Sequence, residues 1–448
     1  MKNRKLVLGI VLLFAFTACA GKYDDEKDFQ VESGSGAVRI TGYAGEKQEI
    51  HIPPKIQKMP VTIIGEGAFS ERNLTGAAIP QGVTAVEDRA FEKNQLTGIV
   101  IPDSVTAIGA WAFAENQLTS VTIGNHVTVI GEKAFSDNRL TGAAIPNSVT
   151  GIGEEAFINN QLTSVNIGNN VAAIEKKTFS NNQLTSVAIP NSVTVIGEEA
   201  FSDNQLTNVS IGNKVESIGV RAFSGNKLTS VTIGSSVAVI ESRAFEKNQL
   251  TGVVIPDSVT TIRARAFSGN QLTSVTIGSG VTVIGDEAFG NNKLAAVTIP
   301  HSVTVMGEEA FSHNQLTSAV IGNGLTTIRY AAFANNKLTS VSIGNRVTVI
   351  GEEAFNNNQL TDVVIPDTVT SIGDYAFSNN KLTSVSIGNG VTEIRYAAFA
   401  DNQLTSITIG ADVAVWTSAF DNGFANFYVA RGRTAGTYTY SGSQWELD

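Results

Sequence analysis

The stretch Asn181–Ser202, NNQLTSVAIPNSVTVIGEEAFS, decides the fold because close copies of it recur along the chain every 22 residues. Phenylalanine occupies every twenty-second position from Phe69 through Phe201 to Phe399, sixteen times without a slip. A strict period of this length indicates a solenoid, in which each unit packs only on its neighbours. We therefore expect one long repeat array in place of the two or three ordinary domains that 448 residues would suggest.

The apolar residues of one unit predict where the chain is extended and where it turns. Val187 and Ile189 alternate with Ser186 and Ala188, which predicts one short strand with its valine and isoleucine facing inward. The segment Gly197–Phe201 (GEEAF) is interpreted as a single helical or 3₁₀ turn with its alanine and phenylalanine facing the core. Each unit would thus contribute one strand and one turn to a capped arc.

An asparagine column closes each unit. It runs from Asn94 through Asn182 to Asn402, fifteen times with the same period. A buried asparagine suits a tight turn because its amide satisfies backbone groups that no sheet partner reaches. The column therefore predicts a ladder of stacked amides along the solenoid.

The N-terminus carries an export signal. Lys2, Arg4 and Lys5 form a positive segment, and Leu6–Phe16 is a short apolar run that ends shortly before Cys19. Eleven apolar residues are too few to span a membrane as a helix but suit a secretory signal peptide, assigned here to residues 1–18. The chain is therefore expected to be exported.

Cys19 is the only cysteine of the chain, so no disulfide framework is possible within it. The small residues before Cys19 resemble a bacterial lipobox, although Phe16 departs from the usual leucine. The resemblance implies that Cys19 is lipidated and anchors the protein to a membrane; the alternative is an ordinary signal peptide with an incidental cysteine. Residues 19–35 would then form a flexible, acidic tether.

Both ends of the array depart from the repeat. Residues 36–69 hold an interrupted first unit and are interpreted as an N-terminal cap, and residues 70–410 as the solenoid proper. In residues 411–448 the last unit degenerates. Trp416 is interpreted as replacing its second isoleucine, and Phe420 arrives 21 residues after Phe399. The tail that follows predicts a strand-rich C-terminal cap.

Composition excludes several classes of function. The net charge of −10 and the scattered basic residues argue against a nucleic-acid binder. No two histidines have the spacing of metal ligands, and no serine lies in a nucleophile motif. The histidines are His51, His126, His301 and His313. Acidic pairs recur at Glu154-Glu155, Glu198-Glu199, Glu308-Glu309 and Glu352-Glu353, and we interpret them as a solvated ridge. We expect no enzyme activity, no cofactor and no catalytic metal.

The unit L-T-x-V-x-I-[PG]-x-x-V-x-x-I-[GER]-x-x-A-F-x-x-N resembles the BspA-like leucine-rich repeats of bacterial surface proteins, from about residue 36 to 420. Units of that family commonly carry cysteine in the asparagine column and commonly run one residue longer. The resemblance implies a right-handed curved solenoid displayed outside the cell. It also implies binding to proteins or host surfaces, with adhesion and extracellular-matrix binding proposed for relatives.

Two surfaces are candidates for partner binding. The outward face of the predicted strands is small and uncharged, which suits broad contact with a protein or a glycan, although duplication of strand-forming residues would produce the same face. Its representatives are Ser186, Ser274 and Thr276. Tyrosine and arginine, which are enriched at protein-binding hot spots, replace glycine and glutamate in a few late units. These residues are Arg329, Tyr330, Tyr375, Arg395 and Tyr396.

From these observations we expect a cell-surface or outer-membrane lipoprotein that binds a protein or glycan partner, most simply on a host or neighbouring cell. The alternative is a lipoprotein that faces the periplasm and has a structural or scaffolding role. Both expectations share every sequence feature and differ only in topology.

Overall fold

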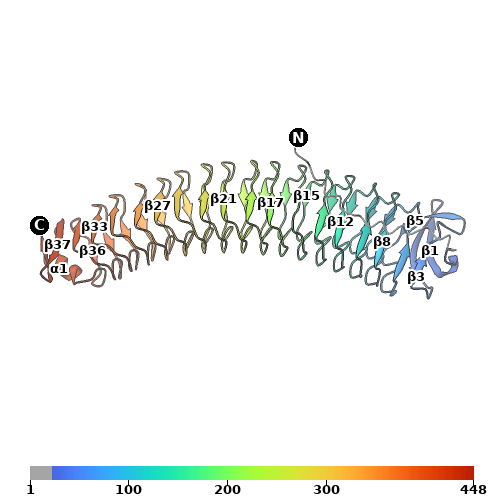
Figure 1. The fold of residues 1–448 in the computed structure, drawn as a ribbon, viewed down its shortest axis with the longest axis horizontal. Coiled ribbons are helices and arrows are strands. Elements are labelled where there is room, and N and C mark those ends of the chain that lie inside the picture. Colours follow the sequence, from blue (N-terminus) through green and yellow to red (C-terminus); the bar gives the residue numbers. More distant parts are fainter. Residues whose placement is uncertain (1–22) are drawn as a thin grey trace, which may run out of the picture.

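The structure, a computed structural model, describes residues 23–448. The predictions of a signal peptide over residues 1–18 and of a lipidated Cys19 lie outside the described residues. Figure 1 shows a long, shallow arc of stacked coils, each coil contributing the same elements in the same order. The chain is a parallel β-solenoid of the leucine-rich-repeat type with very little helix, as the 22-residue period predicts.

Every coil except that of Leu184 carries a first strand, of three or four residues, that follows the leucine of the repeat. Successive strands pair in parallel and in register, as Ser274 does with Gly252. These strands are β3 (Glu49–His51), β6 (Gly76–Ala78), β8 (Gly98–Val100), β10 (Ser120–Thr122), β12 (Gly142–Ala144), β14 (Ser164–Asn166), β17 (Asn208–Ser210), β19 (Ser230–Thr232), β21 (Gly252–Val254), β23 (Ser274–Thr276), β25 (Ala296–Ile299), β27 (Ser318–Ile321), β29 (Ser340–Ser342), β31 (Asp362–Ile365), β33 (Ser384–Ile387) and β35 (Ser406–Ile409).

A second, two-residue strand follows in each coil, where the sequence predicted only a return path. These strands also pair in parallel with the next coil. They are β7 (Ala85–Val86), β9 (Ala107–Ile108), β11 (Val129–Ile130), β13 (Gly151–Ile152), β15 (Ala173–Ile174), β16 (Val195–Ile196), β18 (Ser217–Ile218), β20 (Val239–Ile240), β22 (Thr261–Ile262), β24 (Val283–Ile284), β26 (Val305–Met306), β28 (Thr327–Ile328), β30 (Val349–Ile350), β32 (Ser371–Ile372), β34 (Glu393–Ile394) and β36 (Ala414–Val415).

The predicted helical or 3₁₀ turn is wrong. Gly197–Phe201 and its equivalents form β-turns, and among residues 23–448 the structure has only one 3₁₀ helix and one α-helix, both in the caps. The reason is that the backbone N–H groups bond across to the next coil: Glu199 N donates to the Val220 carbonyl at 2.8 Å, and Phe201 N to the Ala222 carbonyl at 2.9 Å. The residues equivalent to 197–203 form a third side of the coil, called here the turn face.

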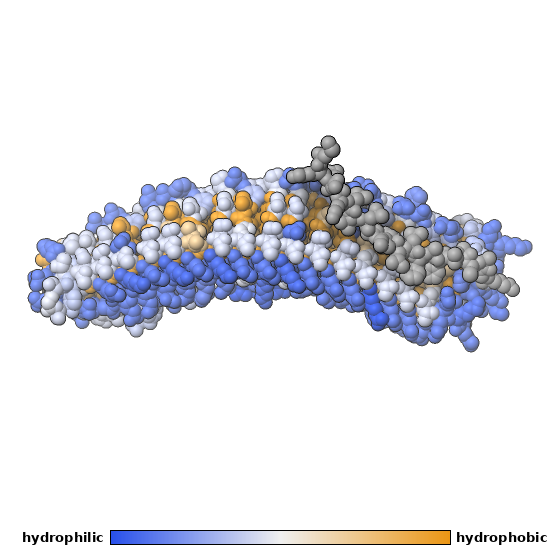
Figure 2. Space-filling view, viewed as in Figure 1, coloured by the Kyte–Doolittle hydropathy of each residue, from blue (hydrophilic) through white to orange (hydrophobic). Residues whose placement is uncertain are grey.

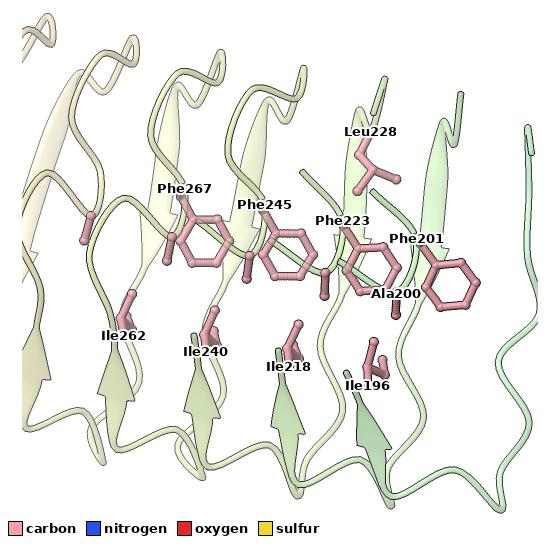
Figure 3. Close-up of a cluster of buried hydrophobic side chains, with 14 of the residues drawn as sticks. Ile196, Ala200, Phe201, Ile218, Phe223, Leu228, Ile240, Phe245, Ile262 and Phe267 are labelled. Carbon is pink, nitrogen blue, oxygen red and sulfur yellow. The ribbon is translucent and has the colours of Figure 1, made fainter. Parts of the chain in front are cut away.

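The core is a set of straight columns along the solenoid axis. The phenylalanine rings stack nearly parallel, with centroid distances between 4.9 and 5.7 Å from Phe69 to Phe420. Figure 3 shows four of these rings above a column of isoleucines, and Phe201 and Ile196 are fully buried. Each ring contacts the rings before and after it, so one coil buries its apolar face only when it has neighbours.

The asparagine ladder closes the coils by hydrogen bonds within and between them. The Asn182 amide nitrogen donates to the carbonyls of Phe157, Phe179 and Ser180 at 3.0, 3.2 and 3.1 Å. Its amide oxygen accepts the backbone N–H of Leu162 at 3.0 Å. One buried side chain therefore satisfies groups of its own coil and of the preceding coil.

The repeat's choice of proline or glycine marks the breaks in the sheet of first strands. From β8 onward, each strand that has a parallel partner in the next coil is followed by a coil with glycine at this position, as β21 (Pro256) is followed by β23 (Gly278). Over the same range the sheet is interrupted before proline coils, as between β23 and β25, which precedes Pro300, whereas β3 pairs with β6 despite Pro80. Proline restricts its own φ and the conformation of the residue before it, which disturbs the end of the strand.

The predicted flexible tether is wrong for the part that the structure describes. The 3₁₀ helix η1 (Glu26–Asp28) leads into β1 (Phe29–Gly34), which pairs antiparallel with β2 (Ala37–Tyr43). Phe29 is buried and its ring lies 5.4 Å from that of Tyr43, a contact that covers the first rings of the core. These residues therefore belong to the N-terminal cap, with β4 (Lys55–Ile56) and β5 (Met59–Ile64).

The C-terminal cap contains a helix that the sequence did not predict. The helix α1 (Phe424–Ala430) precedes β37 (Gly436–Ser441) and β38 (Gln444–Leu447), which extend the sheet of first strands antiparallel to β35. Tyr428 lies buried under the last coil and donates its hydroxyl to the Gly410 carbonyl at 2.6 Å. The cap thus replaces the neighbour that the last coil lacks.

Candidate functional site

The turn face is the side on which the repeat varies most in charge and size. Its two outermost columns are the rows of residues that are equivalent, coil by coil, to Glu198 and Glu199. Glu199 has a φ of 53°, so its side chain leaves the backbone from a left-handed residue and projects over the next coil. The columns therefore present a ladder of unlike side chains on identical backbone, which is an arrangement suited to specific recognition.

The early acidic pairs form ion pairs with lysines of neighbouring coils. Lys176 and Lys177 lie 3.1 and 3.5 Å from Glu198 and Glu199. Lys133 lies 3.4 Å from Glu155 in the same manner. These exposed pairs contribute little stability each. They leave the early turn face close to neutral.

The late acidic pairs have no such partners. Within residues 23–448 no basic side chain lies within ion-pair distance of the four carboxylates Glu308, Glu309, Glu352 and Glu353. Their combined field, with Glu353 as the largest contributor, raises the pKa of Tyr330 above its usual value. Tyr330 is 37% exposed, so an aromatic ring stands in the middle of an acidic surface.

The structure divides the predicted arginine–tyrosine residues into two groups. Tyr375 and Tyr396 come together on adjacent coils, with ring centroids 5.3 Å apart in an edge-to-face contact, and both rings are exposed. The hydrogen bond that the Tyr375 hydroxyl donates to Tyr396 is the main reason why the pKa of Tyr375 is raised. Arg395 is exposed and lies 3.4 Å from Glu393. Tyr330 and Arg329 lie two coils earlier and do not join this contact.

Trp416 was assigned wrongly from the sequence. The position of the second isoleucine belongs to Val415, which pairs with Ile394, and Trp416 follows it on the surface with 50% of its area exposed. Trp416 N bonds to the Ile394 carbonyl, which places Trp416 next to the coil of Arg395. The one-residue deletion before Phe420 moved the indole outward, and counting back from Phe420 would have revealed it.

A groove of about 510 Å³ crosses the middle of the turn face. It forms where small side chains replace glutamate in the outer column, at Val220, Ser242 and Ala264. The sequence analysis missed this groove, although the run of three small residues in one column was visible. Its rim is basic in the middle and acidic at the ends. The basic residues are Arg221, Arg243 and Arg265, and the acidic ones are Glu198, Glu199, Asp286 and Glu287.

The three arginines of the groove differ in how closely a carboxylate of the same chain pairs with each guanidinium. Arg265 is bound closely by Glu287, and this hydrogen bond is the main cause of its raised pKa. Arg221 lies 3.5 Å from Glu199. Arg243 has only a long contact of 3.9 Å to Glu246, so its guanidinium has donors free for another partner.

The strand face, formed by the outward residues of the first strands, carries few charges, among them Glu49 and Asp362. Ser186, Ser274 and Thr276 are all exposed on it, although the structure assigns no strand to the coil of Ser186. Threonines beside the strands bond in sequence along the axis, as Thr273 Oγ1 does to the Thr251 carbonyl at 3.0 Å. A hollow of about 470 Å³ lies at the interruption between β23 and β25.

Figure 2 shows these surfaces as continuous rows: hydrophilic side chains form a band along one edge, with near-neutral and hydrophobic rows beside it. The rows arise because equivalent residues of successive coils lie in line. Hydrophobic side chains reach this surface as single exposed valines such as Val254 and Val364, at 64% and 68% exposure. Scattered apolar residues of this kind are ordinary on a protein surface.

The histidines stay apart from one another and serve the backbone. His301 Nδ1 accepts the Asn323 N–H at 2.9 Å, and His126 Nδ1 lies 2.8 Å from the Asp103 carbonyl. Among residues 23–448 no three histidine, cysteine, aspartate or glutamate side chains are grouped to hold a metal ion. In the same part of the chain, no helix has the length and apolar character needed to cross a membrane.

Comparison with known proteins identifies the class. The sequence model described as "BspA type Leucine rich repeat region" matches residues 62–184, 128–251, 172–294, 238–361 and 348–428. These overlapping matches span more than half of the chain, and the chain therefore belongs to this family of bacterial surface proteins. Leucine-rich-repeat domains of this kind are typically non-enzymatic scaffolds for protein interaction. No curated protein matches the sequence significantly.

Three solved structures of similar fold come from bacteria. A leucine-rich repeat protein from Bacteroides ovatus is 19% identical, with a TM-score of 0.49 over 87% of this chain and 88% of its own. A leucine-rich cell surface protein from Faecalibacterium prausnitzii is 23% identical, with a TM-score of 0.36 over 86% and 94%. The pneumococcal vaccine antigen PcpA is 18% identical, with a TM-score of 0.33 over 88% of both chains.

Proposed function

We propose that the protein is a non-enzymatic lipoprotein of the cell surface or outer membrane that binds a protein partner through the late part of its turn face. The contact between the exposed rings of Tyr375 and Tyr396 carries this proposal. Large exposed aromatic residues side by side on a repeat surface are otherwise costly to maintain in water. They are the residues that anchor protein interfaces.

The surroundings of the two rings suit a protein ligand. A tyrosine side chain has few rotatable bonds, and the backbone of two adjacent coils fixes the position of each ring. Little conformational entropy is therefore lost when a partner binds. Arg395 and Trp416 flank them and add a charge-assisted donor and a further apolar surface. Together these four residues, called here the aromatic site, offer an apolar centre with a polar rim.

The strand face is a second binding surface, and it suits a glycan. Its serines and threonines offer hydroxyl groups without charge, and the hollow between β23 and β25 gives a sugar ring a concave seat. Ser274 and Thr276 lie beside that hollow. Host surface proteins, extracellular matrix or glycans of a neighbouring cell are partners that these two surfaces could recognise.

The anchor belongs to the same proposal. Export by residues 1–18 and acylation of Cys19 would attach the N-terminal cap to the outer membrane. The tether would be limited to the few residues before Asp24, because Asp24 already belongs to the cap: its carboxylate accepts the His51 N–H at 2.7 Å. The alternative function is a periplasm-facing scaffold with the same anchor. The two functions differ in which side of the membrane the solenoid occupies.

The aromatic site is tested by site-specific crosslinking in the producing cells. A photoreactive benzoylphenylalanine replaces Tyr396 in one variant and Thr276, on the strand face, in a matched variant. We expect a discrete adduct with another protein from position 396 that disappears when Tyr375→Ala is added. An adduct only from position 276 would transfer the function to the strand face, and adducts from neither position would overturn protein binding.

A further inference from the structure

The groove on the turn face and the acidic surface around Tyr330 are complementary to one another. The groove has small residues and three arginines, and the acidic surface has large residues and unpaired carboxylates. Both lie in the same two columns of the same side of the solenoid, on either side of the coil that contains Asp286 and Glu287. A surface of this kind can meet its own copy.

We infer that two copies of this chain associate through their turn faces, antiparallel, about a two-fold axis that lies in the interface and runs across the solenoid along the coil of Asp286 and Glu287. In a two-fold interface, residue i meets residue j while j meets i. A rotation about this axis reverses the solenoid direction and keeps the order of the columns, so the column of Glu199 meets the column of Glu199 of the partner copy.

The repeat then fixes which residues meet. Counting equal numbers of coils from the axis, Arg221 faces Glu353 of the partner copy and Arg265 faces Glu309. Both glutamates are half-buried, and neither has an ion pair among the residues that the structure describes. Each contact occurs twice, so four carboxylates without a basic partner would gain one.

Tyr330 is the central contact. The same count places it against Ser242 and beside Arg243, the groove arginine with the weakest internal pair. The exposed ring projects where the groove is hollow, because Ser242 stands in the equivalent column. A guanidinium over a tyrosine ring is favourable, more so when water is excluded. The hollow of the groove and the charge of Arg243 therefore both favour Tyr330 of the partner copy at this position.

One feature of the interface opposes association. Asp286 and Glu287 of the two copies approach each other near the axis. Both carboxylates are engaged inside their own chain: Asp286 Oδ1 accepts the Glu308 N–H at 3.0 Å, and Glu287 binds Arg265. The contact spans six repeats, about 29 Å at a strand spacing of about 4.8 Å. It is smaller than a standard interface, and a reversible dimer with a micromolar Kd is expected.

The test is sedimentation equilibrium of residues 23–448, the part that holds both caps and every coil, between low and high micromolar concentrations. We expect a monomer–dimer equilibrium that weakens as salt is raised. Arg265→Glu alone and Glu309→Arg alone should each raise the Kd roughly tenfold or more, because like charges then face each other at two symmetric contacts. Tyr330→Ala should also weaken the dimer.

The decisive variant carries Arg265→Glu and Glu309→Arg in one chain, which restores opposite charges at both contacts. We expect its Kd to return to within a few-fold of the unmodified chain. Lys227→Glu, on another side of the coil, is the control and should leave the Kd unchanged. A chain that stays monomeric, a dimer that ignores the single reversals, or a double variant that remains weak would each overturn the inference. Circular dichroism confirms that every variant is folded.

Discussion

The asparagine ladder yields the sharpest prediction of stability. In the change Asn182→Ala, the buried Leu162 N–H loses its acceptor at 3.0 Å. Each of the three carbonyls bonded to the Asn182 amide nitrogen keeps a second donor; Phe179, for example, still accepts from Asn204 at 2.9 Å. The main cost is therefore one orphaned buried N–H, about 1–3 kcal/mol, plus smaller losses at the carbonyls.

The total expected cost is about 3 kcal/mol, and it falls on the contact between adjacent coils. Urea unfolding measures it, with amide exchange over residues 157–184 to locate it, since a long repeat array need not unfold in one step. Gln183→Ala, one residue further along and exposed, is the matched control. If Asn182→Ala and Gln183→Ala differ by less than about 0.5 kcal/mol, the ladder does not hold the coils together.

Three further predictions follow from the core, the turns and the C-terminal cap. Phe201→Ala should cost about 3–5 kcal/mol in urea unfolding, because the ring contacts both neighbours in the stack; a loss below about 1 kcal/mol would contradict the packing. Lys247 has a φ of 56° where the neighbouring coils have glycine, so Lys247→Gly should raise stability by about 1 kcal/mol and Lys247→Ala should not. Burial raises the pKa of Tyr428 and Tyr438. The unfolded tyrosines therefore ionise first, so the stability that these groups contribute is present below pH about 10 and is lost above it. Amide exchange of residues 424–447 at pH 8 and pH 11 should show this loss, and equal protection would refute it.

The sequence predicted most of the fold because a strict repeat reports the same packing many times. A single phenylalanine says little, but sixteen in register can only be a buried column. The incorrect predictions fall where the repeat stops, or where backbone N–H groups can bond either within their own turn or to the next coil. GEEAF has the composition of a helical turn, and what decides against a helix is the next coil, whose carbonyls accept the N–H groups.

The two ends of the array and the candidate site were harder to predict, because they depend on residues that depart from the repeat. The tether, the helix α1 and Trp416 lie in segments without a repeat, where composition alone guided the assignment. Tyr375 and Tyr396 could be found from the sequence because they break a column, but their contact depends on backbone geometry. The groove required two columns to be read together across three coils, which a search by single motifs does not do.

Display of the solenoid outside the cell is the claim on which the proposed function depends. It can be tested with one cysteine, because the chain has only Cys19. Lys381 is exposed, so Lys381→Cys offers a reactive thiol to a maleimide that cannot cross membranes, while an acylated Cys19 offers none. The account predicts labelling of intact cells as complete as that of lysed cells, with the unmodified chain unlabelled in both. Labelling of Lys381→Cys only after lysis would contradict surface display and leave the periplasmic scaffold.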